Sequence, residues 1–222
     1  MFAIVIPTFE QIDLLADAIV ALEGCKIFVV DASSIADIHS IYLPRNVSIL
    51  HCKRGRGQQL GAGAEAAIAE GAESLLFLHA DTVLSAGWFA EAQAFTNDPD
   101  NQNMAAVFTF RVDDQGSAAR RLEGLVAWRT KVLALPYGDQ GLLISKDFYL
   151  SLGGYKELEL MEDVDLVRRI GGKRLRVLSA TATTSAAKYQ QAGYLRRSTR
   201  NLICLGLFFL GVPVRWINRI YS

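Results

Sequence analysis

Residues 74–84, SLLFLHADTVL, begin as an apolar strand and end in polar residues. The run from Leu75 to Leu78 carries no polar side chain, and His79 and Asp81 then follow two positions apart. A short apolar run bounded by polar residues is typical of a buried strand. Because open α/β sheets bind ligands beyond the carboxyl ends of their strands, the polar end of this stretch is a candidate site.

Further apolar runs precede this stretch and alternate with helical patterns. Strands are predicted at FAIVI (residues 2–6), KIFVVD (26–31) and VSILHC (47–52). Apolar residues at helical spacing predict helices over residues 12–22, 58–71 and 88–95. Strands that alternate with helices indicate an α/β fold, with a mostly parallel sheet covered on both faces.

The second half of the chain is less regular. Residues 104–112 predict a strand, and residues 118–135 predict an amphipathic helix. The side chains of this helix that we expect to point inward are Leu122, Leu125, Val126, Val132 and Leu133. A loop with a short strand (137–145), a helix ending at Gly153 and a helix over 160–170 are expected to follow. Since no repeat or linker interrupts the chain, we expect a single domain over residues 1–222.

Charge is distributed unevenly along the 222 residues, although the formal net charge is zero. Eleven basic residues and no acidic residue follow Asp165. This asymmetry predicts a basic C-terminal face that meets phosphates, anionic lipids or an acidic partner, while solvated helix faces would give the same pattern. We expect no nucleic-acid partner.

Three cysteines without metal-site spacing, Cys25, Cys52 and Cys204, are expected to be core residues in a reducing compartment. The first residues lack the features of a signal peptide, so we expect a cytoplasmic location. The apolar run over residues 202–214 would reach about 20 Å as a helix, against roughly 30 Å of bilayer hydrocarbon. It is either a buried terminal helix or a segment that lies on the membrane between flanking arginines.

Polar residues at two strand ends could carry chemistry. Asp81 is either a turn former or a carboxylate that faces a metal or phosphate, and His79 is either a core residue or a ligand. In CKRGRGQQLGAGAE (52–65), glycines surround Arg54 and Arg56 just before a helix, which suits phosphate binding. A flexible basic loop is the alternative. The spacing matches neither GxGxxG nor a Walker A loop.

A cluster of acids opens the helix over residues 160–170. Glu162, Asp163 and Asp165 complement the helix dipole at this position. Their mutual repulsion is also expected to raise at least one pKa. A carboxylate tuned in this way can act as a general base.

Five motifs occur in an order that resembles the family 2 glycosyltransferases with a GT-A fold. They are RGRGQQ, LLFLHADT, YGDQG, LGGY and LMEDVDL, and the resemblance runs from Ile4 to about Arg169. Within the family, the chain is most similar to the small bacterial group described as radical-SAM- or selenodomain-associated transferases. The resemblance implies a Rossmann-like, mostly parallel sheet flanked by helices, with a smaller mixed C-terminal part. It also implies a nucleotide-sugar-binding half (1–111) and an acceptor and catalytic-base half (112–222).

The implied activity is inverting transfer of a sugar from a nucleotide diphosphate sugar, such as a UDP-sugar, to an acceptor hydroxyl. The residues that would border the donor's nucleoside are Pro7, Thr8, Glu10 and Asp31. Arg54 and Arg56 would approach the base or the diphosphate. His79 and Asp81 stand in the place of the family's DxD motif, of which the first aspartate has been lost. Asp81 would therefore contact a divalent metal, Mn²⁺ or Mg²⁺, held mainly together with the donor diphosphate.

The resemblance assigns the second half to the acceptor and the chemistry. Asp163 would be the catalytic base, with Glu162 beside it, and Asp139 and Gln140 would line the donor-sugar or acceptor pocket. The acceptor is unidentified and lipid-linked molecules are candidates, with peripheral contact to the inner face of the membrane through the basic C-terminal region. Two alternatives are a nucleotidyltransferase of similar fold and a non-catalytic, membrane-associated protein that binds nucleotide sugars.

Overall fold

The computed structural model describes residues 1–9, 12–22, 24–33 and 44–221 of the chain. Its strands are β1 (Phe2–Thr8), β2 (Lys26–Asp31), β3 (Val47–His51), β4 (Ser74–Phe77), β5 (Thr82–Leu84), β6 (Ala105–Val112), β7 (Leu142–Ser145) and β8 (Leu175–Thr184). Its α-helices are α1 (Ile12–Val20), α2 (Arg56–Ala69), α3 (Trp88–Asn97), α4 (Ser117–Leu133), α5 (Lys146–Ser151), α6 (Glu162–Ile170), α7 (Ala187–Ala192), α8 (Tyr194–Phe209) and α9 (Val214–Tyr221). Short 3₁₀ turns are η2 (Pro99–Asn101), η3 (Gly138–Gln140) and η4 (Gly172–Arg174).

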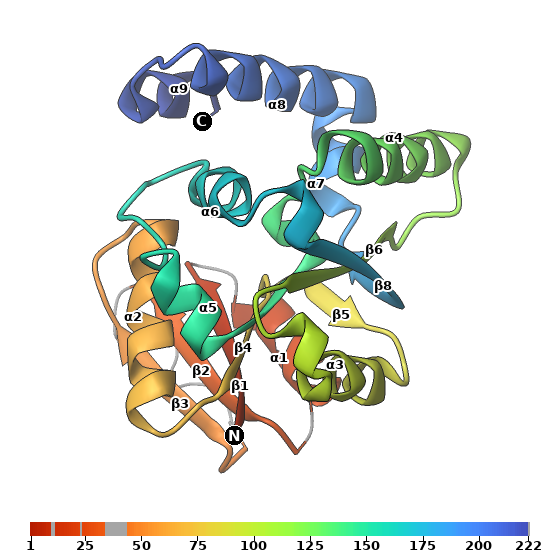
Figure 1. Ribbon diagram of the computed structural model, residues 1–222. Coiled ribbons are helices and arrows are strands. Elements are labelled where there is room, and N and C mark those ends of the chain that lie inside the picture. Colours follow the sequence, from red (N-terminus) through yellow and green to blue (C-terminus); the bar gives the residue numbers. More distant parts are fainter. Residues whose placement is uncertain (10–11, 23, 34–43, 222) are drawn as a thin grey trace.

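The described strands form one sheet in the order β3-β2-β1-β4-β7-β6-β8-β5 (Figure 1). Strands β3, β2, β1 and β4 are parallel to one another, and β8 is parallel to β6. Strand β7 is antiparallel to both β4 and β6, and β5 is antiparallel to β8. The predicted α/β fold is therefore confirmed: its sheet is mostly parallel in the first half and mixed in the second.

Helices cover both faces of the sheet because the side chains of each strand alternate between them. In β1, Ile4 and Ile6 belong to the apolar cluster formed with α1 and α3, whereas Ala3 and Val5 face the cluster formed with α2, α5 and α6. Helix α2 lies close to the sheet at Gly63. A Cβ atom at this position would lie 2.3 Å from a methyl carbon of Val5, so the glycine permits the approach.

Helix α4 buries a narrower stripe than its sequence predicted. Leu122 and Val126 pack inward against β6, as expected. Leu125, Val132 and Leu133 are exposed, which corrects the expectation that they point inward. The reason is that α4 contacts the sheet along one line of small and branched residues, and the side chains beside this line turn away from the core.

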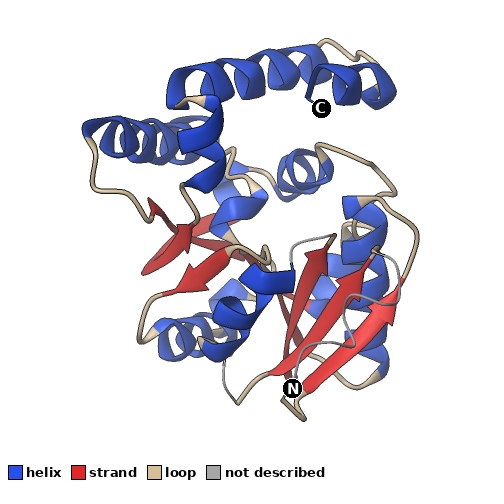
Figure 2. Ribbon diagram, turned by 180° about the vertical axis from the view of Figure 1, so that it is seen from behind, coloured by secondary structure: helices blue, strands red, loops and turns tan. Residues whose placement is uncertain are grey.

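The C-terminal apolar run is broken rather than continuous. Helix α8 ends at Phe209, and α9 begins after Pro213 (Figure 2). Cys204 and Leu205 are buried, whereas Leu202, Ile203 and Leu210 are exposed, so the interpretation as a buried terminal helix holds for one face only. Among the described helices, none is long and apolar enough to cross a membrane.

The three cysteines are free thiols. Cys25 and Cys204 are buried, as expected for core residues, but Cys52 is partly exposed after β3.

Candidate functional site

Two adjoining cavities formed by described residues open beyond the carboxyl ends of β1 and β4. The larger has a volume of about 650 Å³ and the smaller about 110 Å³. Both cavities are lined by Arg56, His79, Asp81, Leu160 and Tyr221. A basic, an imidazole and an acidic side chain therefore stand where the two cavities meet.

The larger cavity has its floor at the end of β1 and the start of α2. Pro7 and Thr8 line it, together with Arg54, whose guanidinium lies 4.3 Å from the centre of the Phe9 ring. The side-chain amide of Gln59 donates to the carbonyl oxygens of Thr8 (2.8 Å) and Val30 (2.9 Å). This buried amide ties α2 to the ends of β1 and β2, so it holds the shape of the floor.

Asp31, which was predicted at this cavity, is placed elsewhere. Asp31 is fully buried at the end of β2 and lines neither cavity. Its Oδ1 accepts from the hydroxyl of Ser33 (2.8 Å), and its Oδ2 lies 3.7 Å from Nδ1 of His51. Glu10 lies outside the residues that the structure describes.

His79 and Asp81 lie in the turn between β4 and β5, because β4 ends at Phe77. The amide of Thr82 donates to the carbonyl of His79 (3.2 Å) and closes the turn. The imidazole of His79 lies against Gly138, where a Cβ atom would be 2.5 Å from Nε2. Glycine at 138 therefore makes room for this imidazole between the two cavities.

Asp163 lines the smaller cavity at the start of α6. Its Oδ2 accepts from the amide of Gly138 (2.8 Å), and its Oδ1 accepts from the amide of Val164 (2.7 Å). Met161, just before the helix, has a positive φ of 64°, a conformation that is uncommon for a residue with a side chain. Both oxygens of Asp163 are thus oriented by the backbone, beside a strained residue that also lines the cavity.

Glu162 is buried behind the cavities, with only 1% of its surface exposed, and it lines neither of them. Its Oε1 lies 3.6 Å from Nε of Arg56. Burial raises the pKa of Glu162 to about 7, while the guanidinium of Arg56 opposes the shift and the carboxylate of Asp163 adds to it. The expected rise in one pKa of the acid cluster is present, but its main cause is burial rather than repulsion.

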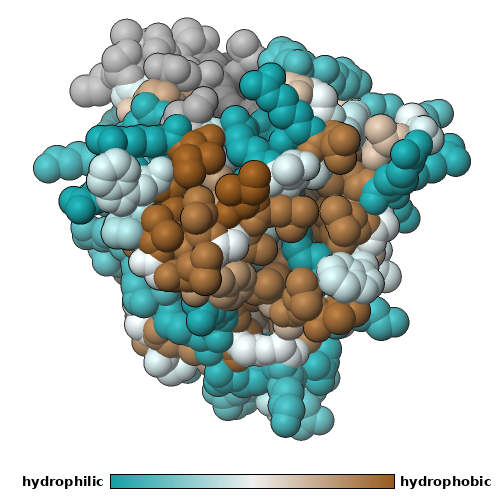
Figure 3. All heavy atoms as spheres, turned by 90° about the horizontal axis from the view of Figure 1, so that it is seen from above, coloured by the Kyte–Doolittle hydropathy of each residue, from teal (hydrophilic) through white to brown (hydrophobic). Residues whose placement is uncertain are grey.

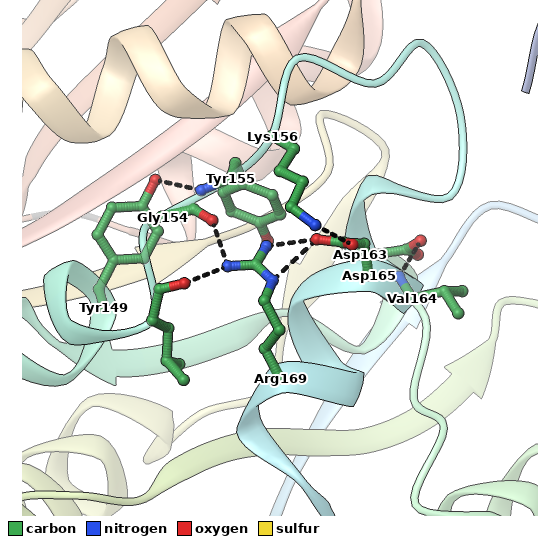
Figure 4. A network of polar contacts seen from close by, with 9 residues as sticks. Tyr149, Gly154, Tyr155, Lys156, Asp163, Val164, Asp165 and Arg169 are labelled. Carbon is green, nitrogen blue, oxygen red and sulfur yellow. Dashed lines mark hydrogen bonds and ion pairs between the residues drawn. The ribbon is translucent and has the colours of Figure 1, made fainter.

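Asp165, the third acid of the cluster, holds α6 to the chain before it (Figure 4). Its carboxylate accepts from Nζ of Lys156 (2.9 Å) and from Nε of Arg169 (2.9 Å). Arg169 also donates to the carbonyl oxygens of Leu152 and Gly154. These contacts fix the first turn of α6 and therefore the position of its acids.

Asp139 and Gln140, neighbours in η3, point in different directions. Asp139 lines the smaller cavity, and burial raises its pKa to about 6, against the opposing charge of Arg129. Gln140 is buried and lines neither cavity: its amide donates to Phe108, and its oxygen accepts from the hydroxyl of Thr130. Of this predicted pair, the structure brings only Asp139 to the site.

The C-terminal helices supply residues that the sequence did not assign to the site. Those that line one or both cavities are Tyr189, Arg197, Asn201, Asn218 and Tyr221. Tyr221 contacts both cavities, and Arg200 lies over its ring at 5.0 Å. The excess of arginines in this region was the only available signal, because these residues reach the site through tertiary packing.

The implied divalent metal can be tested against the side chains at the meeting point of the cavities. Among the described residues, no three His, Cys, Asp or Glu side chains converge as a metal-ligand cluster. Among the described residues, Asp81 is the one carboxylate that lines both cavities. Mg²⁺ is commonly held by one or two carboxylates together with substrate phosphates, so the residues fit a metal shared with a diphosphate.

Comparison with solved structures identifies similar folds at low sequence identity. TarS of S. aureus in complex with UDP has 14% identity and a TM-score of 0.62, over 100% of this chain and 69% of that chain. GalNAc-T7 with UDP, GalNAc and Mn²⁺ has 14% identity and a TM-score of 0.61, over 83% of this chain. This chain spans 44% of the GalNAc-T7 chain and 39% of a longer TarS chain. No family model and no curated protein sequence matches the chain. The likeness confirms the GT-A-type fold expected from the sequence.

Proposed function

We propose that the chain is a glycosyltransferase that moves a sugar from a nucleotide diphosphate sugar to an acceptor hydroxyl. The observation that carries the proposal is the pair of adjoining cavities that share Arg56, His79 and Asp81, with Asp163 in the smaller one. A donor with a diphosphate between nucleoside and sugar matches this arrangement, because its charge falls where the cavities meet. The similar structures contain UDP or UDP-GlcNAc, which favours UDP as the nucleotide.

In this proposal the larger cavity takes the nucleoside. Pro7 and Thr8 border it, and the guanidinium of Arg54, held over Phe9, faces the base or the diphosphate. Arg56 and the start of α2 approach the diphosphate, since helix N-termini and arginines favour phosphate. Asp31 would act on the nucleoside only through the end of β2, because its carboxylate is buried.

A divalent metal is part of the proposal and would be held by Asp81 together with phosphate oxygens. When bound, such a metal neutralises the charge that develops on a leaving diphosphate. His79 lies beside Asp81 at both cavities, where its imidazole can contact the sugar or a phosphate. Arg56 contributes a fixed positive charge to the same point.

Asp163 is the proposed catalytic base. The amides of Gly138 and Val164 orient its carboxylate in the smaller cavity, where it can take the proton of an acceptor hydroxyl. The acceptor oxygen then attacks the anomeric carbon on the face opposite the diphosphate, which leaves with the bonding electrons. The configuration at this carbon is inverted. Glu162 is assigned to position Arg56 rather than to touch substrate, because it is buried beside that guanidinium.

The finer sequence-based expectations belong to this proposal. They include membership of family 2, close relation to the radical-SAM- or selenodomain-associated group, and the donor and acceptor halves meeting near residues 111 and 112. Asp139 is proposed to line the acceptor side of the smaller cavity. The acceptor class includes lipid-linked molecules, and the location is proposed as cytoplasmic, at the inner face of the membrane.

Thermal unfolding with a panel of nucleotide diphosphate sugars, with and without Mn²⁺, tests the proposal. A UDP-sugar is expected to raise the unfolding temperature, and Mn²⁺ is expected to increase that rise. Arg56→Ala should reduce the rise, whereas Arg45→Ala, at an exposed position before β3, should leave it unchanged. An unfolding temperature that no nucleotide sugar changes would overturn the proposal.

A further inference from the structure

Helices α4, α8 and α9 present apolar side chains that are exposed on the surface of the described chain. On α8 and at the residue after it they form one stripe: Leu202, Ile203, Phe209 and Leu210. Trp216 and Ile220 extend the stripe on α9, and Leu125, Trp128 and Val132 form a stripe on α4, which contacts α8. Figure 3 shows a broad apolar area on the side of the molecule where α8 and α9 lie. We call these nine residues the apolar face; so large an exposed apolar area marks an interaction surface.

Exposed arginines accompany the apolar face and lie over its aromatic rings. Arg219 and Arg215 lie 4.6 Å and 5.9 Å from the centre of the Trp216 ring, and Arg168 lies 4.9 Å from that of Phe209. Among the described residues, none of these three arginines has a carboxylate within 4.0 Å. The positive charge of this region is therefore available to an anionic partner.

We propose that the apolar face docks on the surface of a bilayer that contains anionic lipid. Leucine, isoleucine and phenylalanine side chains would enter the boundary of the acyl chains, while arginines meet lipid phosphates. Tryptophan, present on both α4 and α9, favours the interfacial depth. Leu125 and Val132 of α4 were expected to be core, so this surface is wider than the basic C-terminal region alone.

Charge argues against a second copy of the chain as the occupant. A symmetric dimer through the apolar face would bring Arg215 and Arg219 of one copy toward the same arginines of the other, and neither α8 nor α9 carries an acidic residue; Glu159, beside Asn218, is the one carboxylate with a hydrogen bond to α9 among the described residues. An anionic bilayer supplies the missing negative charge over the whole surface. The helices lie along this surface and do not cross the bilayer, in agreement with their length.

The docking helices are also the helices that cover the cavities. Helix α9 has Trp216 and Ile220 on its exposed side, while Tyr221 and Asn218 line the larger cavity. Helix α8 likewise exposes Leu202 and lines the smaller cavity with Arg197. Docking would thus place the site directly beneath the membrane surface. The proposal of docking itself does not depend on sugar transfer.

Co-sedimentation with vesicles tests the proposal. Wild-type protein should sediment with phosphatidylglycerol vesicles, bind phosphatidylcholine vesicles at least about tenfold more weakly, and be released by high salt. The double variant Leu202→Glu/Leu210→Glu should lose about tenfold or more of the binding to phosphatidylglycerol. Arg215→Gln/Arg219→Gln should reduce the preference for anionic lipid.

A matched double variant controls for the added charge. Leu150→Glu/Val20→Glu changes residues outside the apolar face with exposed fractions of 53% and 75%, close to the 52% of Leu202 and 81% of Leu210. It should bind vesicles as the wild type does, and circular dichroism should show that both double variants are folded. Equal loss of vesicle binding in both double variants would overturn the proposal. Wild-type protein that stays in the supernatant with anionic vesicles would overturn it as well. So would a wild-type dimer that Leu202→Glu/Leu210→Glu converts to a monomer.

Two separate measurements distinguish the proposed docking surface from the proposed sugar transfer. Vesicle binding is measured without nucleotide, and stabilisation by a UDP-sugar is measured without vesicles. Vesicle binding without stabilisation by any nucleotide sugar supports the docking surface and contradicts sugar transfer. Stabilisation by a UDP-sugar without vesicle binding contradicts the docking surface and leaves the proposal of sugar transfer standing.

Discussion

The amide of Gly138 donates a hydrogen bond to the carboxylate of Asp163, at 2.8 Å from Oδ2. Gly138 also lies against the imidazole of His79. A single residue of η3 therefore contacts both the proposed base and the side chain beside the proposed metal ligand. Gly138 therefore links the proposed acceptor side of the site to its proposed donor side.

Replacing Gly138 by alanine should disturb both contacts. The added Cβ would lie 2.5 Å from Nε2 of His79, so either the imidazole or the turn must move. We expect release of UDP from a UDP-sugar to fall by about 10²-fold, since a displacement of about 1 Å can cost that much. Gly124→Ala on α4 is the control, because nothing lies within 4 Å of its Cβ and turnover should not change.

Asp163→Asn should remove the proposed base while the donor still binds. Turnover, measured as UDP release, is expected to fall by about 10²–10⁴-fold. The thermal shift with a UDP-sugar should persist, because Asp163 lines only the smaller cavity. Asp147→Asn, at an exposed carboxylate on α5, should leave both measurements unchanged. Normal turnover by Asp163→Asn would exclude this residue as the base.

The metal should bind together with the donor and only weakly without it. Because Asp81 is the one carboxylate of the described chain that lines both cavities, Mn²⁺ alone should shift the unfolding temperature little. Mn²⁺ with UDP should shift it more than UDP alone, and EDTA should reverse this gain. Asp81→Ala should abolish the gain from Mn²⁺. A strong shift by Mn²⁺ alone that Asp81→Ala leaves intact would place the metal elsewhere.

Glu162 should make stability depend on pH. Its folded pKa of about 7 lies above the ordinary value of 4.5, so the folded state binds the proton more tightly. Its contribution to stability is therefore full below about pH 4.5 and is lost as the pH rises through 7. Relative to wild type, Glu162→Gln should gain about 2 kcal/mol of unfolding free energy between pH 5 and pH 8.

Urea unfolding at both pH values measures this difference. Glu157→Gln, at an exposed residue of the loop before α6, is the control and should follow the wild type at each pH. Parallel pH profiles for wild type and Glu162→Gln would show that Glu162 does not titrate differently in the folded state.

Much of the fold could be predicted from local patterns in the sequence. The run KIFVVD forms β2 with the expected bounds, because β-branched and aromatic residues flanked by polar ones specify a buried strand. The start of α2 was predicted less accurately: the helix begins at Arg56, inside the glycine-rich stretch, rather than at residue 58. Helix α4 was predicted with nearly correct bounds but with too many inward side chains, because periodicity does not tell how wide a surface the helix will meet.

The candidate site was predicted better at the end of β4 than at the end of β2, where Asp31 is buried, or where distant elements meet. Asp81 follows β4 by sequence alone, and the structure places it at both cavities. Gln140 is adjacent to Asp139, yet its side-chain amide group forms hydrogen bonds inside the core with the hydroxyl of Thr130 and the carbonyl of Phe108. Tyr221 reaches the site from the last helix, a contact that depends on the packing of α9 and leaves no local pattern.

The most direct test is the phosphorus NMR spectrum of a UDP-sugar incubated with the protein and Mg²⁺, using the donor with the largest thermal shift. The account predicts that water takes the place of the acceptor hydroxyl, that the diphosphate signals of the donor are replaced by those of UDP as free sugar forms, and that Asp163→Asn slows this change. Appearance of UMP with a sugar phosphate would contradict sugar transfer and indicate cleavage at phosphorus instead.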